Sequence, residues 1–356
     1  MTDQDLSESL QQQVRAAADK HHPLRIGGGD SKAFYGRAVD PAHTVLDLAP
    51  HRGVVAYEPT ELVITARAGT PLAEIEALLD RERQQLAFEP PDFSGTATVG
   101  GMVAAGLSGP RRPFGGAVRD AVLGVTLLNG QGQILKFGGQ VMKNVAGYDV
   151  ARLQCGALGT LGVLLYVSLK LQPKPPAELT LTFDLTRTQA RERFTEWSRR
   201  PWSITATAHD GERAYVRLAG VDNAVGAARA ALGGEALPDA AEFWRQLKNH
   251  QLPFFADSTP LWRVSLPPGA PSLEHEGPEF HEWNGTLRWL YTDAAPTALH
   301  AIAQRLGGHA TQFRAQPSPS GPFQPLTPGS LALHQRLKRA FDPHCILNPG
   351  RLYPEL

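Results

Sequence analysis

The sequence predicts an α+β protein of two domains, and three observations carry this prediction. At 356 residues the chain is long enough for about two domains of ordinary size. Segments with the alternating pattern of strands are interspersed with segments whose apolar residues recur at helical spacing. A proline cluster at Gln172–Pro176 separates a glycine-rich first half from a second half of different composition. We therefore expect domains at 1–175 and 176–330, followed by a C-terminal helix and tail at 331–356.

The first half opens with an amphipathic helix over Asp3–Lys20, because Leu6, Leu10, Val14 and Ala17 lie on one stripe. Its expected strands are Leu24–Ile26, Val45–Ala49, Leu62–Ala68, Val122–Leu128, Gln133–Phe137 and Leu161–Leu171.

A second helix is expected to run through Asp80, with Thr70 as its cap and Pro71 at its first position. Asn129-Gly130 is a strong hairpin signal between two of the strands. Val145–Leu153 is expected to form a short helix.

The second half alternates strand and helix candidates, which predicts an α+β domain with a mostly antiparallel sheet. The expected strands are Leu179–Leu185, Ile204–His209, Ala214–Leu218, Trp262–Leu266 and Thr286–Tyr291. The expected helices are Thr188–Arg199, Asp222–Leu232, Ala240–Asn249, Thr297–Leu306 and, after a loop at Gln316–Gly329, Leu331–Phe341.

Composition excludes several classes of protein. The net charge is zero, which argues against nucleic acid as a principal partner. The two cysteines, Cys155 and Cys345, are too few for an iron–sulfur cluster or a Cys-rich zinc site, so no metal is expected. No signal peptide is visible, and the longest apolar stretch, Leu161–Leu169, is too short to span a bilayer. We expect a cytoplasmic protein that reaches a membrane only through partners.

Two glycine-rich segments point to a ligand. Ser94–Gly162 holds sixteen of the chain's 35 glycines and six basic residues against two aspartates, a local charge of six minus two, or +4. Gly27–Ser31 follows directly on a predicted strand. Glycine lets the backbone approach a ligand closely, and its bare N–H groups bind anions. This pattern favours a large phosphate-bearing ligand, although a triple glycine alone is also typical of a flexible loop.

The order and spacing of several motifs resemble the FAD-binding domain of the vanillyl-alcohol oxidase and p-cresol methylhydroxylase (PCMH) superfamily. The motifs are Gly27–Ser31, Pro91-Asp92, Thr96–Met102, Gly115 with Arg119–Gly124, Lys143–Asp149 and Gly156–Gly162. Together they cover Pro23 to Pro173, roughly half the chain, and several independent motifs in sequence are more specific than any one of them.

The resemblance implies a two-subdomain PCMH-type FAD-binding domain followed by a cap domain. Gly27–Ser31 would wrap the pyrophosphate, Thr96–Met102 would form a second wall, Gly159–Val163 would lie near the adenine, and Asn348–Arg351 would close over the isoalloxazine. The implied cofactor-binding residues are Gly27, Gly28, Gly29, Asp30, Ser31, Pro91, Asp92, Thr96, Thr98, Val99, Gly100, Gly101, Met102, Gly106, Arg119, Asp120, Gly159, Gly162, Val163 and Arg351. Superfamily members with covalent flavin often attach it through a histidine in the first glycine loop. Asp30 stands there, so non-covalent FAD is expected.

More closely, the chain resembles the FAD-binding subunits of bacterial glycolate oxidase. This likeness extends to Leu261–Pro268, Gly285–Leu290 and the tail Phe341–Arg351. It implies a multi-subunit enzyme that oxidises glycolate, a small 2-hydroxy acid, to glyoxylate. The partners would be a larger flavin subunit and an iron–sulfur subunit that passes electrons on.

The catalytic residues stay unknown. Relatives that oxidise 2-hydroxy acids carry a Ser-Gly-Glu-His-Gly type motif, which this sequence lacks. The histidines of the corresponding region, none in that context, are His275, His281, His300, His309, His334 and His344. Three hypotheses follow: an FAD-binding subunit of a glycolate oxidase complex, a self-sufficient FAD-dependent 2-hydroxy acid dehydrogenase, and a structural subunit that has lost tight FAD binding.

Several residues admit two interpretations. Arg263 and Arg288 would either bind a carboxylate or stack on tryptophans. Arg111-Arg112 and Lys143 would contact an anion or lie in solvent, Asp120 and Asp149 would cap turns, and Cys155 is expected in the core. The six tryptophans, all in the second half, would serve a partner interface or core packing.

Overall fold

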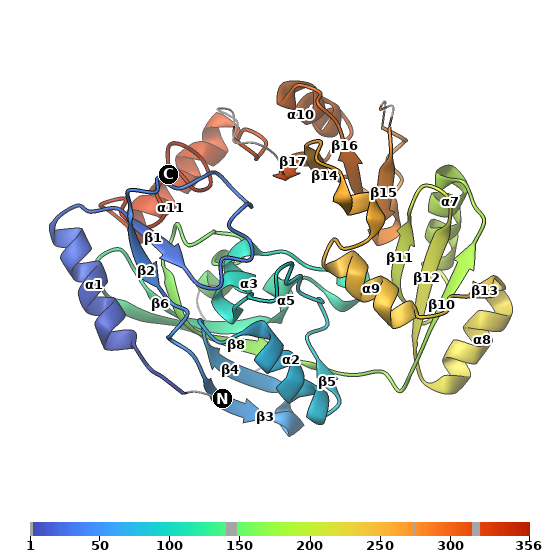
Figure 1. Cartoon of the computed structure of the whole chain (residues 1–356), viewed down its shortest axis with the longest axis horizontal. Helices are drawn as coiled ribbons and strands as arrows, with labels where there is room; N and C mark the ends of the chain where they lie inside the picture. The colour runs from blue at the N-terminus through green and yellow to red at the C-terminus, as the bar shows by residue number, and fades with distance from the viewer. Residues whose placement is uncertain (1–2, 140–147, 274, 276, 315–320) are drawn as a thin grey trace. The chain divides into compact units, whose positions relative to one another are not determined.

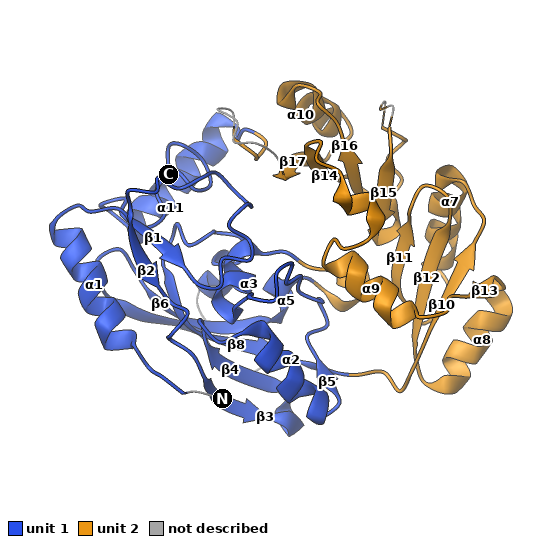
Figure 2. Cartoon of the chain, viewed as in Figure 1, with its two compact units in different colours: residues 1–107, 117–173, 325–356 blue, residues 108–116, 174–324 orange. Residues whose placement is uncertain are grey.

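The computed structural model describes residues 3–139, 148–273, 275, 277–314 and 321–356. The chain divides into two compact units, which Figure 2 distinguishes by colour. Unit 1 comprises Met1–Leu107, Ala117–Pro173 and Pro325–Leu356, and unit 2 comprises Ser108–Gly116 and Lys174–Gln324. The division at Pro173 falls in the proline cluster. The segment Ser108–Gly116, from the middle of the glycine-rich stretch, packs with unit 2.

Unit 1 contains both chain termini and a five-stranded antiparallel sheet with the strand order β3-β4-β8-β6-β7 (Figure 1). A parallel pair, β1-β2, and a short pair, β5-β9, complete its strands. The strands are β1 (Leu24–Gly27), β2 (Thr44–Asp47), β3 (Val54–Glu58), β4 (Val63–Arg67), β5 (Gln84–Gln85), β6 (Val122–Leu128), β7 (Ile134–Gly138), β8 (Val163–Lys170) and β9 (Gln172–Pro173). The helices are α1 (Ser7–Asp19), η1 (Pro59–Glu61), α2 (Leu72–Arg81), α3 (Val99–Ala105), α5 (Val118–Ala121), α6 (Val150–Leu153) and α11 (Pro328–Phe341).

The predicted first helix is confirmed, but it begins at Ser7 rather than at Asp3. Leu10, Val14 and Ala17 are buried in the core, as the stripe predicted. The helix starts late because the Asp5 carboxylate accepts a hydrogen bond from the Ser7 N–H at 2.9 Å, a local bond that competes with helical geometry.

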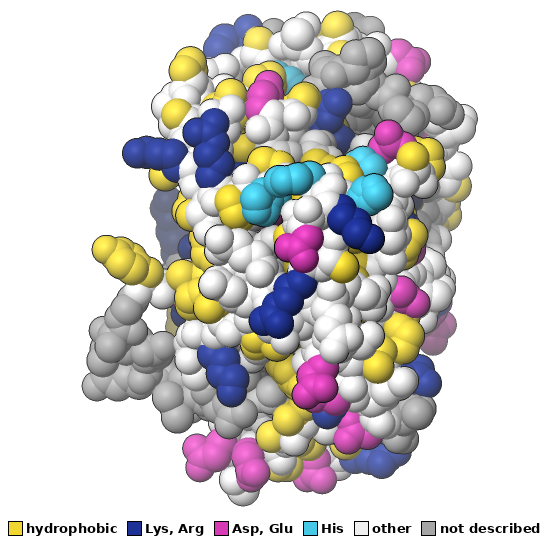
Figure 3. Space-filling view, turned by 90° about the vertical axis from the view of Figure 1, so that its left-hand side faces the viewer, with side chains coloured by type: hydrophobic (Ala, Val, Ile, Leu, Met, Phe, Trp, Pro, Cys, Tyr) yellow, Lys and Arg dark blue, Asp and Glu magenta, His cyan; other side chains and the backbone are white. Residues whose placement is uncertain are grey.

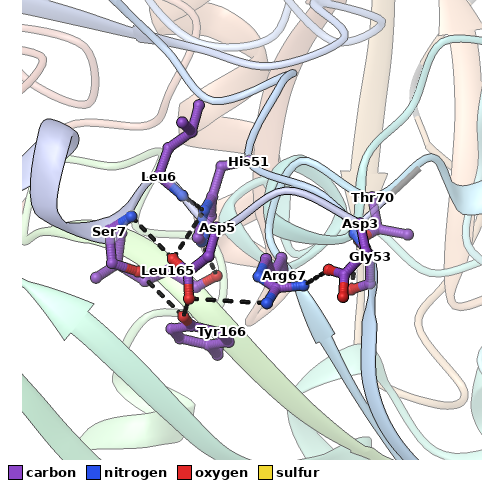
Figure 4. Close-up of polar contacts among 10 residues, drawn as sticks. All are labelled: Asp3, Asp5, Leu6, Ser7, His51, Gly53, Arg67, Thr70, Leu165 and Tyr166. Carbon is purple, nitrogen blue, oxygen red and sulfur yellow. Dashed lines mark hydrogen bonds and ion pairs between the residues drawn. The ribbon is translucent and has the colours of Figure 1, made fainter.

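The N-terminal segment is held against unit 1 by a polar cluster (Figure 4). Asp5 accepts a hydrogen bond from the Tyr166 hydroxyl, and Arg67 forms ion pairs with Asp3 and Asp5. His51 is fully buried here: its Nδ1 accepts from the Leu6 N–H at 3.0 Å, and its Nε2 lies 3.0 Å from the Leu165 carbonyl oxygen. These two bonds require a neutral imidazole that is protonated at Nε2.

We expect the docking of this segment to weaken in acid. Burial lowers the pKa of His51 below its usual value, so the unfolded ring binds a proton before the folded ring does, and the stabilisation present near neutral pH is lost as the pH falls below about 6.5. Burial raises the pKa of Asp5, but hydrogen bonds from Tyr166 and Ser7 outweigh it and hold that pKa at about 2, so Asp5 stays ionised through this range.

Hydrogen exchange of the peptide containing Leu6 tests this expectation. After correction for the intrinsic pH dependence of exchange, protection should drop between about pH 7.5 and about pH 5.5 by up to ~1.4 kcal/mol per pH unit. His51→Gln removes the titrating ring and should remove the pH dependence. Equal protection at both pH values in the unmodified chain would contradict the prediction.

The second helix, α2, confirms the predicted stripe but not its predicted cap. Pro71 occupies the N-cap position, and the Thr70 side chain makes no capping bond. Instead, Thr70 Oγ1 accepts from the Gly53 N–H at 2.9 Å and donates to the Gly53 carbonyl at 3.2 Å. A neighbouring loop therefore competes successfully for the hydroxyl group.

The expected hairpin is confirmed, and the glycine-rich segment after Thr98 contains a helix. The strands β6 and β7 pair in antiparallel register, and the Asn129 side chain accepts from the N–H groups of Gln131 and Gln133 at 3.0 and 2.9 Å. Thr98 caps α3, and Gly106 ends it in the left-handed conformation. Of the short helix expected over Val145–Leu153, residues 145–147 lie outside the described residues, and Val150–Leu153 forms α6.

The C-terminal segment is anchored in unit 1 by a buried ion pair. Lys338 Nζ donates at 2.8 Å to Asp342 Oδ2 and to the carbonyl oxygens of Thr160 and Leu347. Asp342 also accepts from the N–H groups of Ile346 and Leu347. The exposed fractions of the two charged side chains are 2% and 0%. This pair fixes the tail that follows α11.

Unit 2 is built on an eight-stranded sheet in the order β13-β10-β12-β11-β15-β16-β14-β17, and every neighbouring pair is antiparallel. This confirms the predicted α+β class. The strands are β10 (Ala177–Phe183), β11 (Ile204–His209), β12 (Ala214–Gly220), β13 (Glu235–Ala236), β14 (Leu261–Ser265), β15 (Glu279–Glu282), β16 (Leu287–Tyr291) and β17 (His309–Arg314). The helices are α4 (Arg112–Gly115), α7 (Arg187–Trp197), α8 (Asp222–Leu232), α9 (Ala240–Lys248), η2 (Pro253–Ala256), η3 (Trp283–Gly285) and α10 (Pro296–Arg305).

Both signs of charge are spread over the molecular face in Figure 3, in keeping with the zero net charge of the sequence. No helix in the described part of the chain combines the length and the apolar composition that a membrane span requires.

Candidate functional site

Unit 1 contains a cavity of about 580 Å³, within the size range of small-molecule and cofactor sites. Four segments that are far apart in the sequence form it: the loop after β1, the helix α3, the turn Leu158–Gly162, and the tail residues Asn348 and Arg351. Apolar side chains such as Val39 provide much of the remaining wall. The cavity therefore combines apolar surface with a glycine-lined backbone.

The loop after β1 presents a row of backbone donors. The N–H groups of Gly28, Gly29, Asp30 and Ser31 have no hydrogen-bond acceptor within the described part of the chain. Asp30 has a φ of 50°, a left-handed conformation that breaks the strand geometry. Successive N–H groups in such a turn form a concave site for an anion. The loop thus has the donor set that a buried diphosphate requires.

Glycine is required at position 29 because the loop presses directly on the segment before α3. A Cβ atom there would lie 1.4 Å from the Thr96 carbonyl oxygen. The Thr96 hydroxyl donates to the Gly29 carbonyl, and Asp92 Oδ1 accepts from the Ala97 N–H at 2.8 Å. Thr96 therefore fixes the glycine loop, and Asp92 fixes the segment before α3, without lining the cavity themselves.

The tail closes the cavity through two polar side chains. Asn348 accepts from the Ile26 N–H at 2.8 Å and donates to the Leu158 carbonyl at 2.7 Å, so it joins β1 to the turn Leu158–Gly162. The Arg351 guanidinium donates to the carbonyl oxygens of Ala33, Tyr35 and Arg37. Burial lowers the pKa of Arg351. This arginine fixes the loop that follows the glycine turn.

The cavity lining carries a positive formal balance. Arg25, Lys32 and Arg351 face one acid, Asp30, which gives three minus one, or +2. Arg25 and Asp30 form an ion pair at 3.0 Å. Among the described residues of the lining there is no histidine. The site is equipped to hold an anionic ligand, but its lining offers no imidazole base for proton abstraction.

The structure brings together part of the predicted cofactor set. The predicted residues that line the cavity are Gly27, Gly28, Gly29, Asp30, Ser31, Thr98, Gly100, Gly101, Gly159, Gly162 and Arg351. The predicted residues that lie outside the lining are Pro91, Asp92, Thr96, Val99, Met102, Gly106, Arg119, Asp120 and Val163. Within this second group Val99, Met102 and Val163 are core residues and Pro91 is buried. Thr96, Arg119 and Asp120 are exposed, and the Asp120 carboxylate accepts from the Ala117 N–H.

Other residues that line the cavity were not predicted as cofactor-binding residues. They are Arg25, Ile26, Lys32, Ala33, Ala38, Val39, Pro41, Val45, Leu48, Ala68, Ala104, Ala105, Gln154, Leu158, Leu164 and Asn348, the last of which was considered only as part of the tail. The strand pattern of Val45–Ala49 predicted β2, but not that its side chains border a ligand site. The pairing of β1 with β2 decides this, and no local signal contains it.

Several residues that admitted two interpretations make structural contacts. Arg288 donates to the carbonyl oxygens of Gly285, Pro271 and Ala270, and Arg263 lies over the Trp283 ring, 5.2 Å from its centroid. Asp149 caps α6 by accepting from the Arg152 N–H.

Arg111 and Arg112 also make local contacts, and the Cys155 thiol is partly buried. Arg111 pairs with Glu178 at 3.2 Å, and Arg112 lies 4.6 Å from the Trp283 ring centroid. Cys155 is only partly exposed, and burial raises its pKa to about 12. Lys143 lies outside the described residues.

The tryptophans pack inside unit 2 rather than forming an exposed patch. Those with exposed fractions of 6% or less are Trp197, Trp244, Trp262, Trp283 and Trp289. Trp202 is partly buried against the same core. The partner-interface interpretation of these residues is therefore wrong, and core packing accounts for them.

Two family models match the chain. Residues 6–138 match the FAD binding domain, and residues 324–352 match the C-terminal domain of the FAD linked oxidases. The chain therefore has an FAD-binding domain, as predicted. Its described residues fit that cofactor, since the cavity offers unpaired loop amides and a glycine cradle that a Cβ atom would fill.

The chain is similar to the glycolate oxidase subunit GlcE of Escherichia coli (strain K12), with 47% identity over 99% of both chains. It is also 30% identical to a D-2-hydroxyglutarate dehydrogenase of Xanthomonas citri pv. viticola, over 49% of this chain and 37% of that protein. A segment covering 26% of the chain is 41% identical to the glycolate oxidase subunit GlcD of Bacillus subtilis (strain 168) and spans 20% of that protein.

Among solved structures, p-cresol methylhydroxylase with bound substrate matches 97% of this chain and 87% of its own, with a TM-score of 0.73 and 14% identity. At that identity the likeness concerns the fold alone. It confirms the predicted PCMH-type architecture.

Proposed function

Because this chain belongs to the family of the glycolate oxidase subunit GlcE, we propose that it is the FAD-binding subunit of a multi-subunit glycolate (2-hydroxy acid) oxidase. The observation that carries the proposal is the 47% identity over 99% of both chains. The cavity of unit 1 supports it, since its lining provides anion-binding amides and apolar surface together.

We assign the residues in two groups. The predicted residues that line the cavity would contact the cofactor directly: Gly27–Ser31, Thr98, Gly100, Gly101, Gly159, Gly162 and Arg351. The other predicted residues would support this lining without contacting the cofactor. Bound FAD would supply reversible uptake of electrons. The chain's own residues would neutralise the diphosphate, exclude water with the apolar wall and fix the tail. Asp30 forms an ion pair with Arg25, and we propose that FAD is held without a covalent bond.

The oxidation of glycolate to glyoxylate is assigned to the complex rather than to this chain alone. A 2-hydroxy acid oxidase needs a base for the hydroxyl proton, and histidine is absent from the described cavity lining. We propose a larger flavin subunit that carries the substrate site and an iron–sulfur subunit that accepts electrons. The two cysteines of this sequence are too few for such a cluster. Any association with a membrane would run through these partners.

Anaerobic flavin spectroscopy of the purified chain tests the proposal. The chain should bind FAD after reconstitution and release it intact on acid precipitation. Glycolate should leave the flavin of the isolated chain oxidised, and should bleach it only when the partner subunits are present.

Three outcomes would contradict this assignment. A chain that binds no FAD after reconstitution would instead be a structural subunit. Bleaching by glycolate in the isolated chain would indicate a self-sufficient dehydrogenase. Flavin that stays with the acid-precipitated protein would overturn non-covalent binding.

A further inference from the structure

The sheet of unit 2 carries a polar strip between two apolar cores. Across β11, β15 and β16, His209 pairs with His281, and His281 pairs with Arg288. Directly opposed residues point to the same face of a sheet, so these three side chains form one row. At one end the row continues into Ala214, and at the other into Val264.

The apolar residues at the two ends of this row belong to two different hydrophobic clusters, each of which includes residues of a helix. The three polar side chains between them belong to neither cluster. Ala214 belongs to the cluster built with Phe194 of α7. Val264 belongs to the cluster built with Leu299 of α10. Polar and charged groups occupy the interval between these clusters, and His281 lies there 2.7 Å from the Glu279 carboxylate.

Two arginines meet beside this strip around one acceptor. Arg288 Nη2 and Arg191 Nη1 donate to the same Ala270 carbonyl oxygen, at 2.8 and 2.7 Å. Arg288 is only 1% exposed. Burial and the neighbouring charge of Arg191 lower the pKa of Arg288 to about 10 against a smaller opposing effect of Glu279, so the Arg288 guanidinium is charged at neutral pH. Carbonyl oxygens satisfy hydrogen bonds, but they neutralise no charge.

The Glu279 carboxylate interacts electrostatically with Arg288, but neither arginine of the pair forms a direct ion pair with a carboxylate in the described part of the chain. No ion pair within 4.0 Å joins Arg191 or Arg288 to a described carboxylate. The Nε–H of Arg191 is buried and makes no hydrogen bond with a described residue. Arg288 is buried and Arg191 is half-buried, and their two positive charges exceed the one negative charge of Glu279. An anion bound next to them would offset the excess.

A cavity of about 640 Å³ opens at this pair. Its charged lining residues are Arg191, Arg199, Arg200, Arg288, Glu192 and Glu196, which gives four minus two, or +2. It also presents the hydroxyl groups of Thr188 and Thr195. All of its lining residues belong to unit 2, so it is separate from the cofactor cavity of unit 1.

We propose that this cavity binds a small oxyanion with two or more negative charges, a polycarboxylate or a phosphate. Arg191 and Arg288 would bind the oxygens at its base, and Arg199 and Arg200 would contribute from its edge. The paired oxygens of carboxylate and phosphate groups match the planar donor fork of arginine, which accounts for a site built from arginine and not from lysine.

Isothermal titration calorimetry of the full chain in low-salt buffer, with citrate and with inorganic phosphate as separate probes, tests the proposal. Binding of citrate alone would identify a polycarboxylate site, and binding of phosphate alone a phosphoryl site; binding of both supports the shared chemistry. Arg191→Gln should weaken binding by about ten-fold or more, because it removes charge-assisted hydrogen bonds worth ~1.4 kcal/mol or more. Arg229→Gln is the matched control, since Arg229 is an exposed residue of the adjacent helix α8 and does not line the cavity.

Several outcomes would overturn the proposal. They are no binding of either probe below about 1 mM, an unchanged affinity in Arg191→Gln, or an equal loss in Arg229→Gln. If far-UV circular dichroism shows that Arg191→Gln is misfolded, the double variant Arg199→Gln/Arg200→Gln decides instead. Both of these side chains are exposed and are not needed for the core. Its affinity should fall, and an unchanged value would overturn the proposal.

Discussion

Replacement of Gly29 by alanine is expected to weaken FAD binding by about 100-fold or more, equivalent to ~2.7 kcal/mol. The added Cβ would lie 1.4 Å from the Thr96 carbonyl oxygen and 2.6 Å from its carbonyl carbon. Both are backbone atoms, so no rotamer change relieves the overlap. The loop Gly27–Ser31 must move away from Thr96, and its row of unpaired N–H groups then loses its geometry.

Flavin retention and fluorescence titration of the apoprotein measure this effect, and two glycine variants calibrate it. At Gly226 a Cβ atom meets nothing within 4 Å, so Gly226→Ala should leave FAD affinity unchanged. At Gly101, on the cavity wall, the Cβ atom would approach Thr98 Oγ1 at 3.2 Å, and a small loss is expected. If Gly29→Ala bound FAD as tightly as Gly226→Ala, the assignment of this loop to the cofactor would be wrong.

The second large effect is expected at the buried pair of the C-terminal segment. Asp342→Ala leaves the Lys338 ammonium group, whose side chain is 2% exposed, without a counter-charge. Breaking such a pair costs about 3–5 kcal/mol. The loss should also reach the cofactor site, because Lys338 binds the Thr160 carbonyl beside Gly159 and Gly162 of the cavity lining.

Urea unfolding of unit 1, followed by flavin release and far-UV circular dichroism, measures the cost. The double variant Lys338→Met/Asp342→Asn removes both charges and keeps one acceptor oxygen, which serves one of the Ile346 and Leu347 N–H groups, so it should recover part of the stability. Arg339→Gln, an exposed change on the same helix, is the matched control and should stay within about 0.5 kcal/mol of the unmodified chain. A loss below about 1 kcal/mol in Asp342→Ala would show that the pair does not anchor the tail.

The elements that were predicted well are those whose signals are local. The helix α8 spans Asp222–Leu232, as expected from its apolar spacing, and the Asn129-Gly130 turn identified the hairpin between β6 and β7. In both cases the residues that specify the conformation lie within a few positions of one another.

The sequence did not reveal β15, a strand in which charged residues are buried. In β15, Glu279 and His281 bond to each other, and Glu282 accepts from the Trp289 indole. In the sequence alone, charged residues like these are typical of a solvated loop. Their hydrogen-bond partners lie on another strand or bond to them only in the buried strand, so the sequence does not show that they are satisfied. Thr70 was likewise mispredicted as a helix cap, because its hydroxyl group bonds to Gly53, a partner that is not adjacent in the sequence.

The sequence by itself determined the class of ligand: a triple glycine after a strand and a glycine-rich basic stretch favour a large phosphate-bearing ligand, because backbone access and charge are properties of residue type. The resemblance of the motifs and their order to PCMH-type domains is what implied FAD. Only the tertiary structure decided which residues line the cavity. It placed Val99, Met102 and Val163 in the core. It also brought Asn348 to β1 and Arg351 to the loop that follows β1, each from more than 300 positions away. It also assembled Arg191 of α7 and Arg288 of β16 around one carbonyl oxygen, a juxtaposition that depends on tertiary packing and that local sequence does not encode.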